Sequence, residues 1–219
     1  MGLLYDQLQS QLPPGMEIPA PLKQLYDWIE SRGMIVTRRN GEKAGFLFPP
    51  DAMNAGWTKA GRPGGTLIEF VSPAETGLQQ WFGASNTAVL NRLCVFAKCG
   101  SDGSMAAFWL DEHGDQKIVH MGSGSGSTLL CVLAGSVVDF LRLLAIGYDE
   151  ICWPEAFPLP PDHSSFRVEP NTAFQEWVET TFSVTIPATA SEIVKCPSSM
   201  DERDPADGFA KWVLVNQAN

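Results

Sequence analysis

The amino-acid sequence predicts an α+β fold in which a mostly antiparallel sheet is flanked by helices. Four apolar runs with strand character follow one another in the middle of the chain, at residues 93–97, 105–110, 117–121 and 128–133. The turns between them are short, whereas parallel strands need a crossover of about a dozen residues or more, so neighbouring runs are expected to pair antiparallel. An amphipathic helix is predicted directly after the last run, at residues 137–146.

Two helices are predicted ahead of this sheet. Residues 1–14 have leucines near helical spacing, and Pro13-Pro14-Gly15 ends the pattern. A clearer helix begins near Pro21, a residue that suits the first turn, and ends near Gly33, which can close a helix. Its apolar stripe is formed by Leu22, Leu25, Tyr26 and Ile29.

Short strands are predicted between these helices and the central runs. Residues 34–37 and 45–48 form a hairpin in which Asn40-Gly41 is the two-residue turn. Residues 66–71 return to strand character. The intervening residues 49–65 are rich in Pro and Gly, which predicts a long loop or insertion, and such loops are often functional.

Turn and capping signals organise the rest of the chain. Polar turns at 100–104 and 111–115 separate the first three central runs. Ser136 and Asp139 fit a capping box for the helix at 137–146, and Gly147 supplies its stop. A later helix is predicted from a second capping box at Thr172 and Gln175, with an apolar stripe of Phe174, Trp177, Val178 and Phe182.

The chain is interpreted as one domain, residues 1–219, with a loop insertion near 49–65. It has no internal repeat and no clear linker. Its tail is polar and loop-like from Lys195 until the apolar segment 209–215.

Composition disfavours several classes of partner. Lys and Arg number 15 against 25 Asp and Glu, which gives a net charge of −10 and disfavours nucleic acid and anionic membranes. No apolar run approaches the roughly 20 residues that span a bilayer, and the N-terminus lacks the regions of a signal peptide. We therefore expect a cytoplasmic protein. Its five cysteines are odd in number and widely spaced, which favours reduced thiols over a disulfide framework.

No cofactor or metal site is predicted. Residues 122–127, Gly-Ser-Gly-Ser-Gly-Ser, lack the Lys of a P-loop and do not open a helix, so a flexible turn is favoured. The acidic turn at 111–115 suits a solvated hairpin tip better than a calcium loop. The three His have no metal-ligand spacing with one another or with the Cys residues. A nucleophilic Cys–His pair would need Cys99 or Cys152 to meet a distant His.

The acidic turns form the predicted binding surface. They lie at loops or element ends, where they would attract a basic protein, although ordinary surface charge explains them equally well. Asp201, Glu202, Asp204 and Asp207 belong to the same set. The residues predicted to bind a partner are Trp57, Asp102, Asp111, Glu112, Asp115, Asp149, Glu150 and Trp153.

Five segments carry a resemblance to a known superfamily. They are the Pro-containing helix entry at 18–26, the hairpin turns at 99–104 and 110–115, the helix at 135–144, and the Asp-Gly-Phe-x-x-Trp sequence at 207–212. In these segments, and mainly over residues 90–215, the chain resembles the SUKH superfamily. This group includes the yeast cell-wall assembly regulator and many bacterial immunity proteins.

The resemblance implies an α+β fold and a binding function. Many relatives neutralise polymorphic toxins, often cytoplasmic nucleases or deaminases, by direct contact. Nucleases need basic surfaces to hold phosphate, which an inhibitor with a charge of −10 would complement. We therefore expect a non-catalytic immunity protein that binds a basic cognate toxin. The alternatives are a regulatory interaction scaffold of the cell-wall assembly regulator type, and an enzyme with a dispersed site around Cys99 or Cys152.

Overall fold

The computed structural model describes residues 2–51, 65–72, 77–83, 86–161 and 170–217. Its centre is a seven-stranded sheet in which the strands lie in sequence order, and each pairs antiparallel with the next. The predicted α+β class is therefore confirmed. The strands are β1 (Ile35–Thr37), β2 (Lys43–Gly45), β3 (Glu69–Phe70), β4 (Leu93–Lys98), β5 (Met105–Leu110), β6 (Gln116–Met121) and β7 (Leu130–Ala134).

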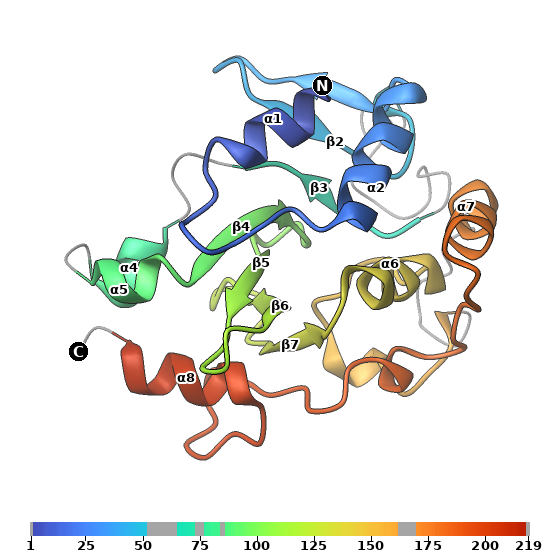
Figure 1. The fold of residues 1–219 in the computed structure, drawn as a ribbon. Coiled ribbons are helices and arrows are strands. Elements are labelled where there is room, and N and C mark those ends of the chain that lie inside the picture. Colours follow the sequence, from blue (N-terminus) through green and yellow to red (C-terminus); the bar gives the residue numbers. More distant parts are fainter. Residues whose placement is uncertain (1, 52–64, 73–76, 84–85, 162–169, 218–219) are drawn as a thin grey trace.

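Helices cover both faces of the sheet (Figure 1). One face packs against α1 (Leu3–Gln9), α2 (Ala20–Ser31), α6 (Val137–Ile146) and α7 (Thr172–Phe182). The other face packs against α4 (Leu78–Phe82), α5 (Thr87–Leu90) and α8 (Gly208–Asn216). Two 3-10 turns complete the described elements, η1 (Pro154–Ala156) and η3 (Ala190–Glu192). None of the helices in the described ranges is long and apolar enough to cross a membrane.

The alternation of side chains along the strands assigns each residue to one of the two cores. Phe96 and Phe108 point to the α6 face, where their rings stack at a centroid distance of 4.6 Å. Trp109 points to the opposite face and meets two aromatic rings of α8, Phe209 at 5.2 Å and Trp212 at 5.7 Å. These aromatic contacts hold α8 against β5.

Local signals predicted several elements closely. Helix α6 has the predicted bounds, Ser136 caps it by accepting the N–H of Asp139 at 3.1 Å, and Gly147 ends it with a φ of 96°. Strand β5 also coincides with its prediction. Helix α2 begins and ends as expected, with Gly33 in the left-handed region just beyond it.

The first hairpin differs from its prediction. The Arg38 N–H donates to the Glu42 carbonyl oxygen at 2.8 Å, so three residues rather than two form the loop, and Gly41 takes the left-handed position. This is the common three-residue alternative to a two-residue turn. The returning strand is Lys43–Gly45 instead of 45–48, and only Glu69–Phe70 of the predicted segment 66–71 forms a strand.

The cap predicted for α7 is wrong. Asn171, not Thr172, caps the helix, because its side-chain oxygen accepts the N–H of Phe174 at 3.1 Å. Gln175 does not return to the helix start. Its amide instead reaches across to α6 and donates to the carbonyl oxygen of Ala145 at 2.9 Å.

Candidate functional site

The tip of the β5–β6 hairpin combines a buried carboxylate with exposed ones. Asp111 is 7% exposed, and its Oδ1 accepts the backbone N–H groups of His113 and Asp115, both at 2.9 Å. Its other oxygen forms an ion pair with Lys117. Gly114 closes the loop with a φ of 83°. Asp111 therefore shapes the turn, whereas Glu112 and Asp115 are exposed.

The bonds to Asp111 stabilise its charged form. Burial alone would raise the pKa of this carboxyl, but the Lys117 ammonium and the two backbone N–H groups outweigh burial and lower the pKa to about 2. The carboxylate is thus ionised at neutral pH with its charge already matched by Lys117.

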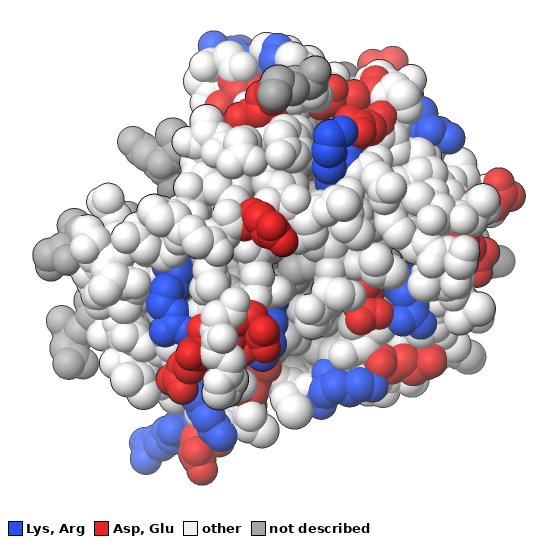
Figure 2. Space-filling model, in the orientation of Figure 1, with Lys and Arg blue, Asp and Glu red and all other residues white. Residues whose placement is uncertain are grey.

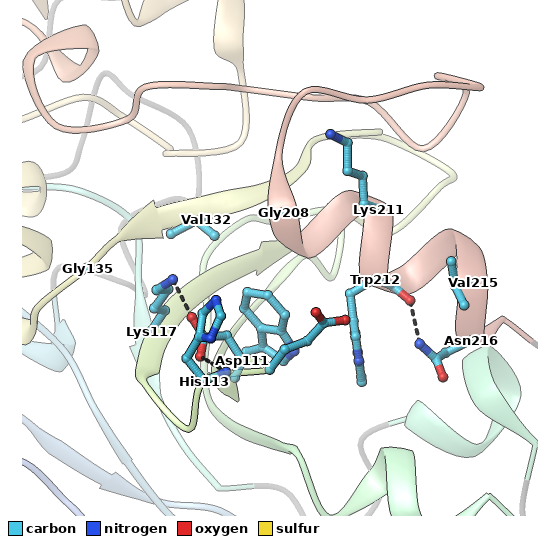
Figure 3. Close-up of a pocket in the computed structure, with 12 residues that line it drawn as sticks. Asp111, His113, Lys117, Val132, Gly135, Gly208, Lys211, Trp212, Val215 and Asn216 are labelled. Carbon is cyan, nitrogen blue, oxygen red and sulfur yellow. Dashed lines mark hydrogen bonds and ion pairs between the residues drawn. The ribbon is translucent and has the colours of Figure 1, made fainter.

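A hollow of about 510 Å³ lies between this hairpin and α8 (Figure 3). Trp109 and Trp212 contribute its aromatic lining, and Glu112 and His113 come from the hairpin tip. From α8, Lys211 and Val215 also line it, and Val215 is 83% exposed. The hollow therefore joins one exposed acid, Glu112, and one exposed base, Lys211, to accessible apolar surface.

Asp102 lies at the centre of a hydrogen-bonded loop assembly. Its carboxylate accepts the N–H groups of Ser127 at 2.7 Å and Ser104 at 2.9 Å, together with the hydroxyls of Ser104 and Ser123. Burial favours a raised pKa, but these four donors lower the pKa of Asp102 below its ordinary value. The half-buried carboxylate is therefore engaged by neighbouring loops.

The Gly-Ser segment at 122–127 wraps around this same carboxylate. A Cβ at Gly126 would lie 2.6 Å from the Cβ of Asp102, and a Cβ at Gly122 would lie 2.5 Å from the Ser127 carbonyl oxygen. The glycines therefore permit close packing of this turn.

Glu150 is also held by internal bonds. Its two carboxylate oxygens accept the N–H of Ser101 at 2.9 Å and the indole N–H of Trp153 at 3.0 Å. Trp153 remains 38% exposed. Asp149 is half-buried, and its carbonyl oxygen accepts the N–H of Leu67 at 2.7 Å. These residues join the loop after α6 to the β4–β5 turn and to the segment before β3.

The predicted acidic residues therefore do not form one surface. Glu112 and Asp115 lie together at the exposed hairpin tip, whereas Asp207 is 5% exposed and Asp201, Glu202 and Asp204 are exposed in the preceding loop. On the face shown in Figure 2, acidic and basic side chains are interspersed between wide uncharged areas. Trp57 lies outside the described residues.

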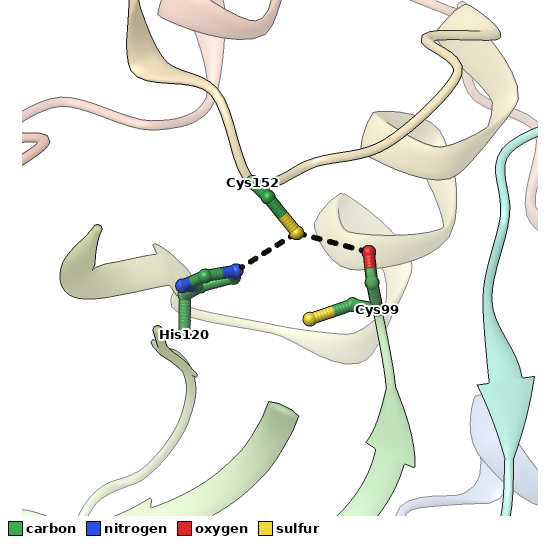
Figure 4. A group of neighbouring side chains, drawn as sticks. All are labelled: Cys99, His120 and Cys152. Atoms are coloured by element: carbon green, nitrogen blue, oxygen red, sulfur yellow. Dashed lines mark hydrogen bonds between the residues drawn. The ribbon is translucent and has the colours of Figure 1, made fainter. Parts of the chain in front are cut away.

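A second candidate site is a buried group of two thiols and an imidazole (Figure 4). Cys99 follows β4, His120 lies in β6, and Cys152 lies between α6 and η1. All three are fully buried, and their ligand atoms lie within 4.8 Å of one another. Spacing along the chain could not reveal this group, because each member comes from a different element.

Hydrogen bonds fix the orientation of the group. His120 Nδ1 donates to the Leu129 carbonyl oxygen at 2.9 Å, so the hydrogen of a neutral ring lies on Nδ1 and the lone pair of Nε2 faces Cys152 Sγ at 3.4 Å. The Cys152 thiol also lies 3.1 Å from the carbonyl oxygen of Cys99, to which it can donate.

The two thiols differ in acidity. The hydrogen bond from Cys99 lowers the pKa of Cys152, and burial opposes the effect. Burial raises the pKa of Cys99. The arrangement supplies the Cys–His proximity that a nucleophile requires. The three side chains are fully buried, however, and none of them lines a surface hollow among the described residues. We therefore do not assign it a catalytic role.

Comparison with known proteins does not assign the chain to a family. The chain matches no family model, and no curated protein or solved structure is significantly similar to it.

Proposed function

We propose that this protein is an immunity protein that binds a basic cognate toxin, of the nuclease or deaminase kind, and covers its active site or substrate groove. The observation that carries the proposal is the exposed hairpin tip with Glu112 and Asp115, of which Glu112 lines the hollow between the β5–β6 hairpin and α8. Inhibition by occlusion requires no catalysis from the inhibitor.

The composition of this surface suits a protein partner. Interfaces combine an apolar centre with a polar rim. Here Val215 is 83% exposed beside the hollow and Leu214, next to it, is 39% exposed, while Glu112 supplies charge at the hairpin. Apolar side chains of this size on a short helix offer buried area to a partner, and the acids select a basic one.

Glu112 and Asp115 are the acidic residues whose charge is available to attract such a partner. No described residue donates a hydrogen bond to the side chain of Glu112 or Asp115, in contrast to Asp102 and Asp111. Exposed charges attract an oppositely charged protein before contact and are screened by salt. The net charge of −10 has the same sign as this local charge.

Two of the five segments that resemble the SUKH superfamily lie at this surface. The resembling turn at 110–115 forms the hairpin tip, and the resembling segment at 207–212 spans the cap and first turns of α8. Both line or border the same hollow. The resemblance supports the class of function, and the position of the interface is argued from the hollow and the exposed acids alone.

Two steps test the proposal. The tagged protein is first recovered from its own cells, and co-purifying proteins are identified by mass spectrometry. One stoichiometric partner with a basic toxin domain supports the immunity function. Several sub-stoichiometric partners, none with such a domain, contradict it and favour the regulatory scaffold.

Binding of that partner is then measured for Glu112→Lys/Asp115→Lys. A matched control is Glu176→Lys/Glu179→Lys on α7, where both side chains are exposed. Each pair changes the net charge by the same four units. We expect the hairpin variant to bind at least about tenfold more weakly and with less dependence on salt, because long-range attraction is lost. Equal weakening by both variants would show that the hairpin is not the interface.

A further inference from the structure

The buried group of Cys99, His120 and Cys152 plays no part in the proposed interface. Its members lie at the end of β4, in β6 and in the loop after α6, so the fold brings them together from three distant parts of the chain. Two thiols and an imidazole that converge without forming a disulfide need a chemical explanation.

We propose that Cys99, His120 and Cys152 bind one zinc ion through two thiolates and one imidazole nitrogen. Zinc lies about 2.3 Å from sulfur and about 2.1 Å from nitrogen, so a tetrahedral site separates these two ligand atoms by about 3.6 Å. The distance between Cys152 Sγ and His120 Nε2 is 3.4 Å. All three ligand atoms lie within 4.8 Å of one another, which one ion can bridge with small side-chain movements.

The imidazole is already oriented as a ligand. Metal-binding His residues usually donate the other ring N–H to a carboxylate or a backbone carbonyl, which fixes the tautomer. His120 does this through Nδ1, which donates to the Leu129 carbonyl oxygen at 2.9 Å. The nitrogen left to bind an ion, Nε2, points toward the thiols (Figure 4).

A chain of hydrogen bonds also positions Cys152. Asp102 accepts the N–H of Ser127, and the Ser127 hydroxyl donates to the Cys152 carbonyl oxygen at 2.7 Å. A Cβ at Gly100 would lie 2.6 Å from Cys152 Sγ, so the β4–β5 turn packs directly against the sulfur. Asp102, Ser127 and Gly100 act here as positioning residues.

Charge favours a divalent ion in this enclosed place. Binding releases one proton from each thiol to solvent, and two thiolates with Zn²⁺ and a neutral imidazole have no net charge. A neutral set costs less to bury than an uncompensated ion. The fourth position falls to water or to the Cys99 carbonyl oxygen, because no further His, Cys, Asp or Glu among the described residues joins the group.

The bound ion would act as a structural crosslink. It would tie the loop after α6 to β4 and β6, which are otherwise held there by packing and by the bonds of Asp102 and Glu150. Because metal binding to a folded site adds to the free energy of unfolding, removing zinc is expected to lower the unfolding temperature.

The test uses the purified full chain under reducing conditions. The protein is stripped with a chelator and titrated with zinc chloride in competition with a chromophoric chelator. X-ray absorption at the zinc edge then reports the ligands. We expect one zinc per chain and a shell that contains two sulfurs at about 2.3 Å. Cobalt chloride is a second probe on the unmodified chain, and thiolate-to-cobalt charge-transfer absorption is expected.

Variants assign the ligands. Cys99→Ser and Cys152→Ser are each expected to weaken zinc binding more than about tenfold. Cys196→Ser is the matched control, because Cys196 is exposed and outside the group. Circular dichroism checks that each variant is folded. The proposal is overturned if the unmodified chain binds no zinc against the chelator, if the absorption shell lacks sulfur, or if folded Cys99→Ser and Cys152→Ser variants bind zinc as the control does.

Discussion

Asp207 joins the last helix of the protein to the last strand of its sheet through Val132. Its Oδ2 accepts the N–H of Val132 in β7 at 3.0 Å, and its Oδ1 caps α8 by accepting the N–H of Ala210 at 2.9 Å. The side chain is buried, and burial raises its pKa. This carboxylate thus fixes α8, and with it one wall of the hollow, relative to the sheet.

Replacement of Asp207 should destabilise the protein strongly. Asp207→Ala removes a helix cap and leaves the Val132 N–H without its acceptor, which together should lower the free energy of unfolding by about 3 kcal/mol. Urea denaturation followed by tryptophan fluorescence measures this change. Asp204→Ala is the control, because Asp204 is exposed three residues earlier and its loss should change stability by less than about 0.5 kcal/mol. Similar midpoints for both variants would contradict the role given to Asp207.

Elements specified by neighbouring residues were predictable from the sequence. The helix α6 could be placed because Ser136, Asp139 and Gly147 signal its two ends within the same short segment. The antiparallel order of β4, β5 and β6 followed from short turns, since such connections exclude a parallel arrangement. These inferences need no knowledge of the rest of the fold.

The direction of a polar side chain was not predictable in the same way. Asp102, Asp111 and Glu150 occur in polar turns that the sequence presents as solvated surface, but each carboxylate accepts a backbone N–H group of a loop. The group of Cys99, His120 and Cys152 was also hidden, because its contacts join residues 21 to 53 positions apart. Only the pairing of β4, β5 and β6 brings Cys99 and His120 together. Both failures arise from tertiary contacts, which residue type and spacing do not encode.

The ion pair of Asp111 predicts a loss of stability in acid. The folded protein lowers the pKa of this carboxyl to about 2, so the unfolded chain, whose pKa is near the ordinary 3.8, takes up the proton first as the pH falls. The stabilisation is therefore complete above about pH 5 and is lost progressively as the pH falls toward about 2. Because Lys117 is one-third exposed, water screens the pair, and the contribution should be about 1 kcal/mol.

Asp111→Asn isolates this contribution. The variant should be less stable than the natural sequence at pH 7 and should approach it near pH 2, where the natural carboxyl also loses its charge. Urea unfolding at a series of pH values between about 2 and 7 gives the difference directly. Asp115→Asn, at an exposed position in the same loop, controls for the loss of one negative charge. A difference between Asp111→Asn and the natural sequence that does not change with pH would rule out the ion pair as its source.

Two valines of α8 allow the contribution of this helix to folding to be measured separately from its contribution to partner binding. Val213 is fully buried against the sheet, whereas Val215 is 83% exposed beside the hollow. Replacement by Ala is the same chemical change on the same helix, with the same gain in helix propensity, so the difference between the two variants reports burial. Val213→Ala should lower the free energy of unfolding by about 2 kcal/mol, and Val215→Ala should change it by less than about 0.5 kcal/mol.

For partner binding, in contrast to stability, Val215→Ala should have the larger effect and Val213→Ala the smaller one. Val215 offers apolar area that a partner can bury, so Val215→Ala should weaken the complex by about 1 kcal/mol, whereas folded Val213→Ala should bind as the natural protein does. Isothermal titration with the partner recovered from its own cells, carried out well below the unfolding temperature of Val213→Ala, compares them. If Val215→Ala leaves the affinity unchanged while the Glu112→Lys/Asp115→Lys variant lowers it, the partner contacts the acidic tip without entering the hollow.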